Sequence, residues 1–229
     1  MKWKVIDSGF LTCSENMAID ERLLRLLKTD PQPILRFYEW TESSATYGYF
    51  TDPSKYLKKN SILNIAKRPT GGGLLFHLWD FTFSIFIPAG MPFFSFNTLQ
   101  NYQYVNEKIS QSIEKTTGKR NVLLQSEEPC ENAICQNFCM AKPTLNDVML
   151  DNKKVAGGAQ RRTRHGFIHQ GSISLVVPDY NFLEEILIDS QIIESMKNKS
   201  SYLIDESSPF QLHTFKKELK NVITNSFLE

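Results

Sequence analysis

The sequence predicts a mixed α+β domain whose strands form a largely antiparallel sheet. Some segments repeat apolar residues every three or four positions, as the stretch after Thr12 does, and this spacing predicts amphipathic helices. Other segments alternate apolar and polar residues, most clearly residues 81–87, and a period of two predicts a strand. Short turns such as Asp151-Asn152 join neighbouring segments, as they do between antiparallel strands. Helices packed on an antiparallel sheet make an α+β domain.

The first half of the chain is expected to open with a short strand at residues 3–7, followed by a helix. That helix begins at Thr12, because Thr12 and Glu15 have the spacing of a capping box, and it stops before Pro31. Branched and aromatic residues then predict strands, and Pro53 marks the start of a short helix. The strands are expected at residues 34–40, 45–50, 62–66, 74–77 and 81–87, and the short helix at residues 54–59.

In the second half, Asn97 caps a helix with a continuous apolar stripe, and Gly118 closes it. Residues 125–144 are expected to form a long loop that holds three of the four cysteines. Strands and a further helix follow, and Ser208 opens the last helix with a second capping box. These strands are expected at residues 145–150, 154–160 and 167–177, and the helix before the last one at residues 180–188.

Composition and charge exclude several classes of protein. The chain has 229 residues, of which 41% are hydrophobic and 22% charged, as in an ordinary globular protein. Its 26 basic and 25 acidic side chains leave a net charge of +1, which argues against a dedicated nucleic-acid-binding protein. No apolar run approaches the length of a membrane-spanning helix, and Asp7 interrupts the stretch that a signal peptide would need. With four cysteines, we expect the reducing cytoplasm and no disulfide scaffold.

The segment from Arg68 to His77 is the first candidate site. Gly71, Gly72 and Gly73 lie between two predicted strands, and glycine lets a backbone approach a ligand closely or adopt a positive φ. Exposed amides there can hold an anion, with the Arg68 guanidinium beside them. The segment matches neither a P-loop nor a dinucleotide-binding motif, and the alternative is a flexible hairpin turn.

The segment from Asn146 to His169, which opens with a predicted hairpin, is the second candidate. Asn146 and Asp147 are expected to begin one strand, and Lys154 to begin its partner. The return strand has little side-chain bulk, so we expect a flat or long ligand to lie against it beside Lys154. The alternative is a solvated lysine at the edge of a hairpin. The small residues of this strand are Gly157, Gly158 and Ala159.

The cysteine-rich loop and a basic run are weaker candidates. Cys130, Cys135 and Cys139 lack a fourth ligand at zinc spacing, so we expect no metal site. A single reactive thiol and three ordinary reduced cysteines are both consistent with this spacing. The basic run is expected at a hairpin tip, either solvated or in contact with an acidic partner or phosphates. It consists of Arg161, Arg162, Arg164 and His165.

Taken in order, these segments resemble the lipoate–protein ligase and octanoyltransferase family, which belongs to a larger group with the biotin–protein ligases. The resemblance covers about residues 12–173. An Asn-Met-Ala-Ile-Asp-Glu segment begins at Asn16, and Arg68 is followed by the three glycines and His77. The remaining matches are Asn146-Asp147-Val148, the segment from Lys153 to Gln160, and His169-Gln170-Gly171.

This resemblance implies a mixed sheet with an apolar tunnel for lipoate or octanoate. It implies a lipoate–protein ligase that uses ATP and Mg²⁺ to make an acyl-adenylate and passes the acyl group to a lysine. The acceptors would be lipoyl domains of 2-oxoacid dehydrogenase E2 subunits and the glycine-cleavage H protein. Lys154 would hold the acyl and phosphate oxygens. The other substrate-binding residues would be Arg68, Gly71, Gly72, Gly73, His77, Asn146, Asp147, Gly157, Gly158, Ala159 and His169.

Departures from the family pattern leave two alternatives to the ligase, which is our main expectation. Leu78 stands where relatives have Asp, and only 58 residues follow Gly171 (229 − 171), so we expect one catalytic domain over residues 1–229 without an accessory C-terminal domain. The Cys-x-x-x-Pro segment at Cys139 resembles octanoyltransferases that take octanoate from acyl carrier protein through a thioester, without ATP. A catalytically inactive acyl- or nucleotide-binding relative is the second alternative.

Overall fold

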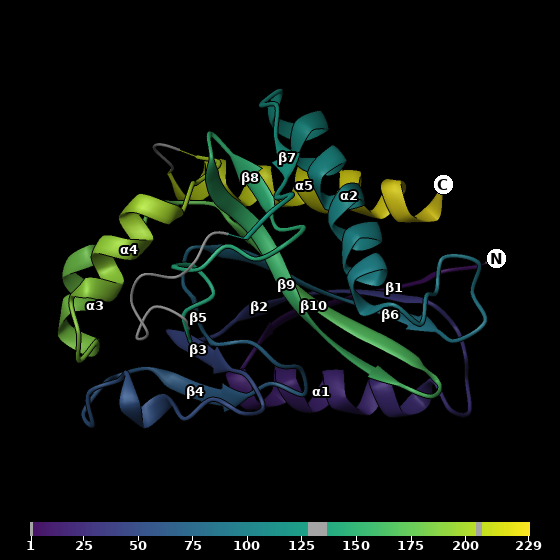
Figure 1. Ribbon diagram of the computed structural model, residues 1–229, viewed down its shortest axis with the longest axis horizontal. Coiled ribbons are helices and arrows are strands. Elements are labelled where there is room, and N and C mark those ends of the chain that lie inside the picture. The colour runs from purple at the N-terminus through teal and green to yellow at the C-terminus, as the bar shows by residue number, and fades with distance from the viewer. Residues whose placement is uncertain (1, 128–136, 205–207) are drawn as a thin grey trace.

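The computed structural model describes residues 2–127, 137–204 and 208–229, and its larger sheet organises the molecule (Figure 1). In spatial order its strands are β1 (Lys4–Leu11), β2 (Ile34–Trp40), β6 (Asp80–Pro88), β10 (Gly166–Ser174), β9 (Lys153–Thr163), β8 (Val148–Leu150) and β7 (Val122–Leu123). β1 and β2 run parallel, and every later pair of neighbours runs antiparallel. The sheet is therefore mixed and largely antiparallel, as the sequence predicted.

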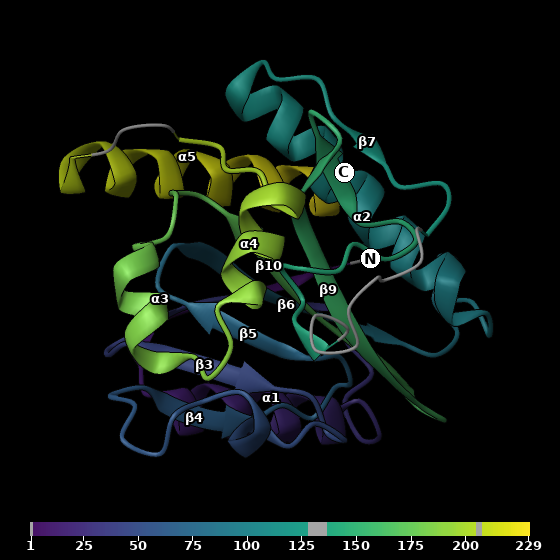
Figure 2. The same ribbon diagram turned by 60° about the vertical axis from the view of Figure 1, so that its left-hand side comes forward.

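A smaller sheet packs beside the larger one (Figure 2). It consists of β4 (Asn64–Lys67), β3 (Ser44–Tyr47) and β5 (Leu74–His77), in that order. Its core is shared with α3 (Tyr180–Ile186) and α4 (Gln191–Lys199), where Phe76, Phe138, Leu183 and Ile193 are buried together. The two sheets and their helices confirm the predicted α+β class.

Helices cover both faces of the larger sheet, which gives three layers (Figure 1). On one face, α2 (Thr98–Thr117) and α5 (Pro209–Leu228) bury Ile109 and Leu219 against Phe83 of β6. On the other face, α1 (Cys13–Leu26) buries Leu24 against Phe86 of β6. None of the helices among the described residues is long and apolar enough to cross a membrane.

The double coverage corrects the prediction of a half-buried strand at residues 81–87. Phe81, Phe83, Ile85 and Ile87 face the main core as expected, but Thr82 and Ser84 are buried too. Both hydroxyls have partners there, since Ser84 donates to Asp20 Oδ2 at 2.6 Å and Thr82 donates to the carbonyl of Tyr38 at 2.5 Å. The polar half of the alternation therefore belongs to a buried polar layer, because α1 covers the face that was expected to meet solvent.

The helix ends follow the local signals in the sequence. Thr12 and Glu15 form the predicted capping box, and Ser208 and Gln211 form the second one. Gly118 closes α2 in the left-handed region at φ 68°.

Elements without such signals were predicted less well. The sequence analysis missed α4, which has only nine residues and no side-chain cap on Ser190. The predicted short helix at residues 54–59 is a single 3₁₀ turn, η1 (Pro53–Lys55).

Candidate active site

Residues of α1, the larger sheet and the smaller sheet together line a pocket. It holds about 530 Å³ of space, counting its open mouth. It brings together Arg68, His77, Cys139 and Lys154, which are far apart in the sequence. The remaining lining residues are Met17, Tyr38, Thr46, Leu75, Met140, Ala156, Gly157, Gly158, Ala159, Gln170, Gly171, Ser172 and Ser174.

The glycine-rich loop, residues 68–73, is folded around the Arg68 side chain, which is 4% exposed. Its Nη1 donates to the carbonyl and the hydroxyl of Thr46, at 2.9 and 2.8 Å. Its Nη2 donates to the carbonyls of Gly71 and Gly73, at 3.1 and 2.8 Å. The loop therefore presents carbonyl oxygens to a cation, whereas the sequence analysis expected amides that face an anion.

Close approach explains why this loop needs glycine. Gly72 has φ +86°, and a Cβ there would lie 3.2 Å from Arg68 Nη2 and 3.7 Å from Cys139 Sγ. A Cβ on Gly73 would lie 2.0 Å from the carbonyl oxygen of Asn137. Gly48, which the sequence analysis did not single out, approaches the loop from β3, and its Cβ would lie 1.8 Å from the carbonyl oxygen of Gly72.

His77 is held from both sides of its ring. Nε2 lies 2.7 Å from Thr46 Oγ1, and Nδ1 lies 2.8 Å from Asp80 Oδ2. A carboxylate only accepts, so Nδ1–H donates to Asp80, and Nε2 is left to accept from the Thr46 hydroxyl, which itself accepts from Arg68. The carboxylate missing at Leu78 is thus supplied by Asp80, which sequence spacing did not reveal. Trp40 stacks on the ring with centroids 4.0 Å apart.

Cys139 sits half-buried at the pocket with a free thiol. Its backbone amide donates to the carbonyl of Leu74 at 3.1 Å, and its Sγ lies 4.0 Å from Arg68 Nη2. Cys13 is different, because burial raises the pKa of its thiol to about 12 and the thiol donates to the carbonyl of Ala45. Cys130 and Cys135 lie outside the described residues, so the metal prediction for them stays a prediction.

Lys154 forms a buried ion pair with Asp147, with Nζ and Oδ2 2.7 Å apart. The same carboxylate accepts from Tyr102 at 2.7 Å and from the backbone amide of Thr144 at 2.7 Å. Burial and the neighbouring Asp147 hold the pKa of Tyr102 well above its ordinary value, so it stays a donor. Gly157 makes room for the pair, since a Cβ there would lie 2.2 Å from Asp147 Oδ1.

One expectation about this hairpin is corrected, and one alternative is ruled out. Asn146 and Asp147 precede β8 rather than begin it, because Asn146 turns the chain at φ 66°. Lys154 is 7% exposed and is not a solvated lysine at the hairpin edge. Lys153 points away from it, as alternation along a strand requires, and donates to the carbonyl of Lys197 at 3.0 Å.

His169 and Asn146 are not brought to the pocket, although both were predicted substrate-binding residues. The predicted residues Gly71, Gly72, Gly73 and Asp147 are not in its lining either, although Gly72 approaches Cys139 and Asp147 pairs with Lys154. His169 lies on the opposite face of β10, stacked on Phe83 and next to Tyr102. It is fully buried, and desolvation lowers its pKa to about 3, which keeps the ring neutral. A Cβ on Gly158 would lie 2.3 Å from His169 Nε2, so this glycine admits the ring while its own backbone lines the pocket.

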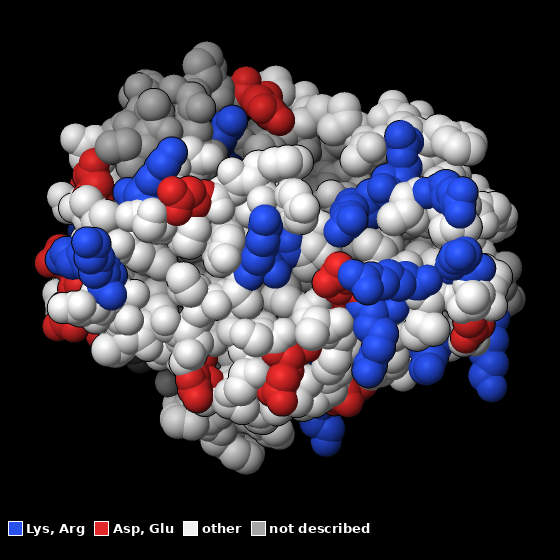
Figure 3. Space-filling view, turned by 90° about the horizontal axis from the view of Figure 1, so that it is seen from below, with Lys and Arg blue, Asp and Glu red and all other residues white. Residues whose placement is uncertain are grey.

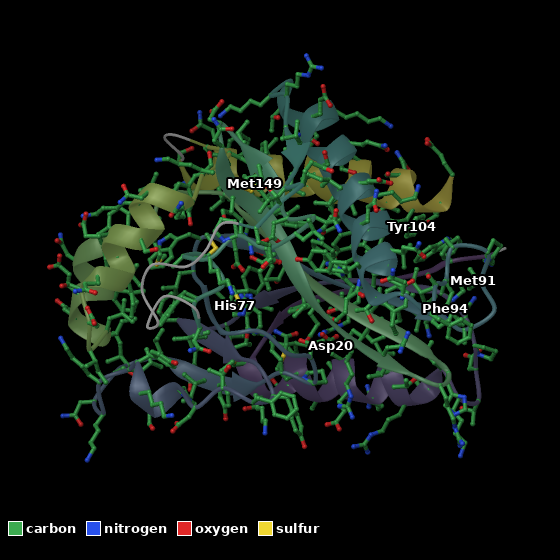
Figure 4. All side chains as sticks on the ribbon, in the orientation of Figure 1. Asp20, His77, Met91, Phe94, Tyr104 and Met149 are labelled. Atoms are coloured by element: carbon green, nitrogen blue, oxygen red, sulfur yellow. The ribbon has the colours of Figure 1, made fainter. Side chains whose placement is uncertain are left out.

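A buried polar network supports the pocket floor from α1, and Figure 4 shows Asp20 between that helix and the larger sheet. Asp20 pairs with Arg36 at 2.7 Å and also accepts from Gln170 Nε2 at 2.7 Å. Burial raises the pKa of Asp20, and the Arg36 guanidinium opposes that shift. Gln170 in turn accepts from Thr70 at 2.7 Å, which ties the glycine-rich loop to β10. Asp20 and Gln170 stood in the motifs of the sequence, but nothing in the pattern indicated that they would meet.

The basic run lies at the β9–β10 hairpin beside the C-terminal end of α1. Arg161, Arg162 and Arg164 are exposed, and Arg161 reaches the carbonyl of Pro69 at 3.4 Å, next to the glycine-rich loop. On α1, Arg22 and Arg25 are exposed as well. Figure 3 shows Lys and Arg side chains gathered over one half of the face that α1 presents.

Curated relatives correct the expected reaction. The octanoyltransferase LipM of Bacillus subtilis is 28% identical over 219 residues, which cover 86% of this chain and 76% of LipM. LipM of Halalkalibacterium halodurans is 25% identical over 234 residues, covering 96% of this chain and 84% of LipM. These names contradict our main expectation of an ATP-dependent lipoate–protein ligase and agree with the first alternative.

Solved structures and a family model confirm the fold and the family. A bipartite lipoate protein ligase from Thermoplasma acidophilum has a TM-score of 0.70 at 22% identity, covering 99% of this chain and 82% of its own. A lipoate-protein ligase A bound with ATP has a TM-score of 0.72 at 20% identity, covering 99% and 84%. The family model of the lipoyl protein ligase A/B catalytic domain matches residues 12–224. The chain belongs to this family, and it is an enzyme of the lipoate and octanoate transferase group.

Proposed function

We propose that this enzyme is an octanoyltransferase that forms a thioester on Cys139 and needs neither ATP nor Mg²⁺. It would take an octanoyl group from a thioester donor such as octanoyl acyl carrier protein and pass it to a lysine. The observation that carries the proposal is the meeting of Cys139, Arg68 and Lys154 at one pocket. The naming of the curated relatives as octanoyltransferases supports it independently.

The first step is attack of the Cys139 thiolate on the carbonyl of the donor thioester. A new C–S bond forms to Cys139, the bond to the donor sulfur breaks, and the departing thiolate takes up a proton from solvent. Cysteine suits this role because a thiolate is a strong nucleophile and a thioester keeps the acyl group activated without a nucleotide.

The second step is attack of the acceptor lysine amine on the Cys139 thioester. A C–N bond forms, the C–S bond breaks, the amine loses its proton to solvent, and the Cys139 thiolate is restored. Each step passes through a tetrahedral species with negative charge on the acyl oxygen. Lys154, which Asp147 holds in place at 2.7 Å, is the donor that we assign to this oxygen. Pre-placed donors of this kind are worth about 10²–10³ in rate.

The acceptors that we propose are lipoyl domains of 2-oxoacid dehydrogenase E2 subunits and the glycine-cleavage H protein. One structural neighbour was studied together with its E2 lipoyl domain, which supports this kind of partner. Lipoate remains a second acyl group that the pocket would accept. The residues that bind the acyl chain are proposed to be the small ones on β9, Gly157 to Ala159, and Gly171 of β10.

The proposal is tested by weighing an unmodified lipoyl domain after incubation with the enzyme. One reaction contains octanoyl acyl carrier protein and no nucleotide, and the other contains free octanoate or lipoate with ATP and Mg²⁺. The expected result is the mass gain of one octanoyl group in the first reaction and none in the second. Acyl transfer only in the reaction with ATP would overturn the proposal.

A further inference from the structure

Arg68 is a buried cation without an anionic partner. Its four hydrogen-bond acceptors are neutral oxygens of Thr46, Gly71 and Gly73. Among the residues that the structure describes, none places a carboxylate within ion-pair distance of it, whereas the buried Arg36 and Lys154 each have an aspartate at 2.7 Å. A buried charge with only neutral partners is costly, so this site is suited to receiving an anion.

The group placed to become that anion is the Cys139 sulfur, 4.0 Å from Arg68 Nη2. Gly72 keeps the space between them open, because a Cβ there would touch both groups. We propose that Arg68 is the counter-ion of the Cys139 thiolate, and that Thr46, His77 and Asp80 orient it. The inference rests on the proposed function, in which that thiolate is the nucleophile.

The orienting groups form one directed chain of hydrogen bonds. Asp80 accepts from His77 Nδ1, His77 Nε2 accepts from the Thr46 hydroxyl, and Thr46 Oγ1 accepts from Arg68 Nη1. The two ends of the chain are fixed, because a guanidinium only donates and a carboxylate only accepts. The chain fixes the Arg68 fork so that Nη2 points toward Cys139. Thr46, His77 and Asp80 are therefore positioning residues and do not touch the sulfur.

The other ionisable groups around this pocket do not supply the same charge. Lys154 is compensated by Asp147, and His77 lies 2.8 Å from the carboxylate of Asp80. Burial raises the pKa of Tyr38 far above its ordinary value, so it is uncharged. Arg68 is the cation that remains to favour the thiolate, and a nearby cation lowers the pKa of a thiol.

The test is the pH dependence of the rate at which iodoacetamide alkylates Cys139, read by mass spectrometry of the Cys139 peptide. The assay uses full-length enzyme with Cys130→Ser and Cys135→Ser, which removes the thiols outside the described residues. The wild-type midpoint is expected below the ordinary value of about 8.5 for a free cysteine. Arg68→Gln is expected to raise the midpoint by about one unit, and so to cut the rate near neutral pH by roughly tenfold.

Two further variants separate charge from position. Arg68→Lys keeps a cation without the planar fork, so its midpoint should lie between those of the wild type and Arg68→Gln. Thr46→Val removes the link between His77 and Arg68 and should raise the midpoint by a smaller amount. Arg161→Gln is the matched control, because it removes an exposed arginine beside the same loop and should leave the midpoint unchanged.

Cys13 reports folding within the same experiment. Its buried thiol, with a pKa raised to about 12, stays unmodified in folded protein and becomes reactive if a variant unfolds. If Cys13 becomes reactive in Arg68→Gln, that variant is unfolded, and the inference is then decided by comparing the Cys139 midpoints of Arg68→Lys and Thr46→Val with that of the wild type. A wild-type alkylation midpoint at the value of a free cysteine would overturn the inference. So would folded Arg68 and Thr46 variants whose midpoints equal that of the wild type.

This assay needs no acyl donor, so it separates the inference from the proposed function. A lowered midpoint that depends on Arg68, with no octanoyl thioester ever formed on Cys139, would reject the function and leave the counter-ion pair standing. Octanoyl transfer through Cys139, with an alkylation midpoint like that of a free cysteine, would support the function and reject the counter-ion pair.

Discussion

At the scale of single residues, Cys139 distinguishes the proposed transferase from the ligase that the sequence first favoured. Cys139→Ser replaces the thiol with a hydroxyl that is far less nucleophilic and leaves the pocket nearly unchanged. We expect transfer from octanoyl acyl carrier protein to fall by about 10³-fold or more. Initial rates of lipoyl-domain modification measure this loss. Cys13→Ser is the control and should keep most of the activity, since Cys13 is buried and is not among the residues that line the pocket.

Lys154 offers a second test, with its neighbour as the control. Lys154→Ala removes the proposed oxyanion donor and should lower the rate by about 10²-fold or more. It also strands the buried Asp147, so the free energy of unfolding should drop by about 3 kcal/mol, as for a broken buried ion pair. Lys153→Ala should change neither quantity much, because its ammonium is on the outer face. Urea denaturation alongside initial rates checks both, and an active Lys154→Ala with an inactive Lys153→Ala would contradict these roles.

At the scale of elements, adjacent glycines of the glycine-rich loop differ in whether they can carry a side chain. Gly72→Ala places a methyl group 3.2 Å from Arg68 Nη2 at φ +86°, where an L-residue costs about 1 kcal/mol or more. Gly71→Ala has no atom within 4 Å of the new Cβ and no positive φ. We expect slower transfer and lower stability only in Gly72→Ala, measured by initial rates and thermal unfolding. Equal behaviour of the two variants would mean that this loop is an ordinary turn.

The elements also show what the sequence could predict. Local signals were sufficient where hydrogen bonds close within a few residues, as at the capping boxes of Thr12 and Ser208. They failed where tertiary contacts decide, as at Ser84, which is buried because α1 packs over its face of the sheet. They also failed at His169, because membership of a motif does not say which face of a strand the side chain takes. Its neighbour Gln170 is the one that lines the pocket.

At the scale of the whole molecule, charge is distributed unevenly although the net charge is only +1. Among the exposed cations of α1 and the β9–β10 hairpin, Arg161 reaches the glycine-rich loop, where it contacts the carbonyl of Pro69. A field of this kind accelerates encounter with an acidic partner and weakens as salt is added. The donor that we propose is a carrier protein, and we expect this basic face to be the surface that an acidic carrier protein approaches.

Charge reversal on this face tests that expectation. Arg162→Glu with Arg164→Glu should lower kcat/KM for octanoyl acyl carrier protein by about tenfold at low salt, and the difference should shrink at high salt. A small donor, octanoyl N-acetylcysteamine, should be used equally well by variant and wild type. Lys115→Glu is the control, since Lys115 is exposed on α2 across the sheet from α1. A loss that is independent of salt, or equal for the small donor, would contradict steering by this face.

The sequence did not determine which reaction the enzyme catalyses, ligation with ATP or transfer from a thioester. Arg68, His77, Lys154 and the small residues of β9 line one pocket, and the fold is shared with ligases. What separates the two is whether the sulfur of Cys139 meets the activated carbonyl. The fold brings Cys139 Sγ to 4.0 Å from Arg68 Nη2, an approach that no spacing in the sequence reveals.

The central claim is that Cys139 carries the acyl group, and intact-mass analysis of the enzyme tests it most directly. The enzyme is incubated with octanoyl acyl carrier protein, without nucleotide and without an acceptor, and is then denatured in acid and weighed. The account predicts a mass gain of one octanoyl group, located on the Cys139 peptide, removed by hydroxylamine and absent from Cys139→Ser. Addition of a lipoyl domain before quenching should discharge it to the acceptor. An enzyme that modifies the lipoyl domain while its own mass stays unchanged, or that is acylated at another residue, would contradict the account.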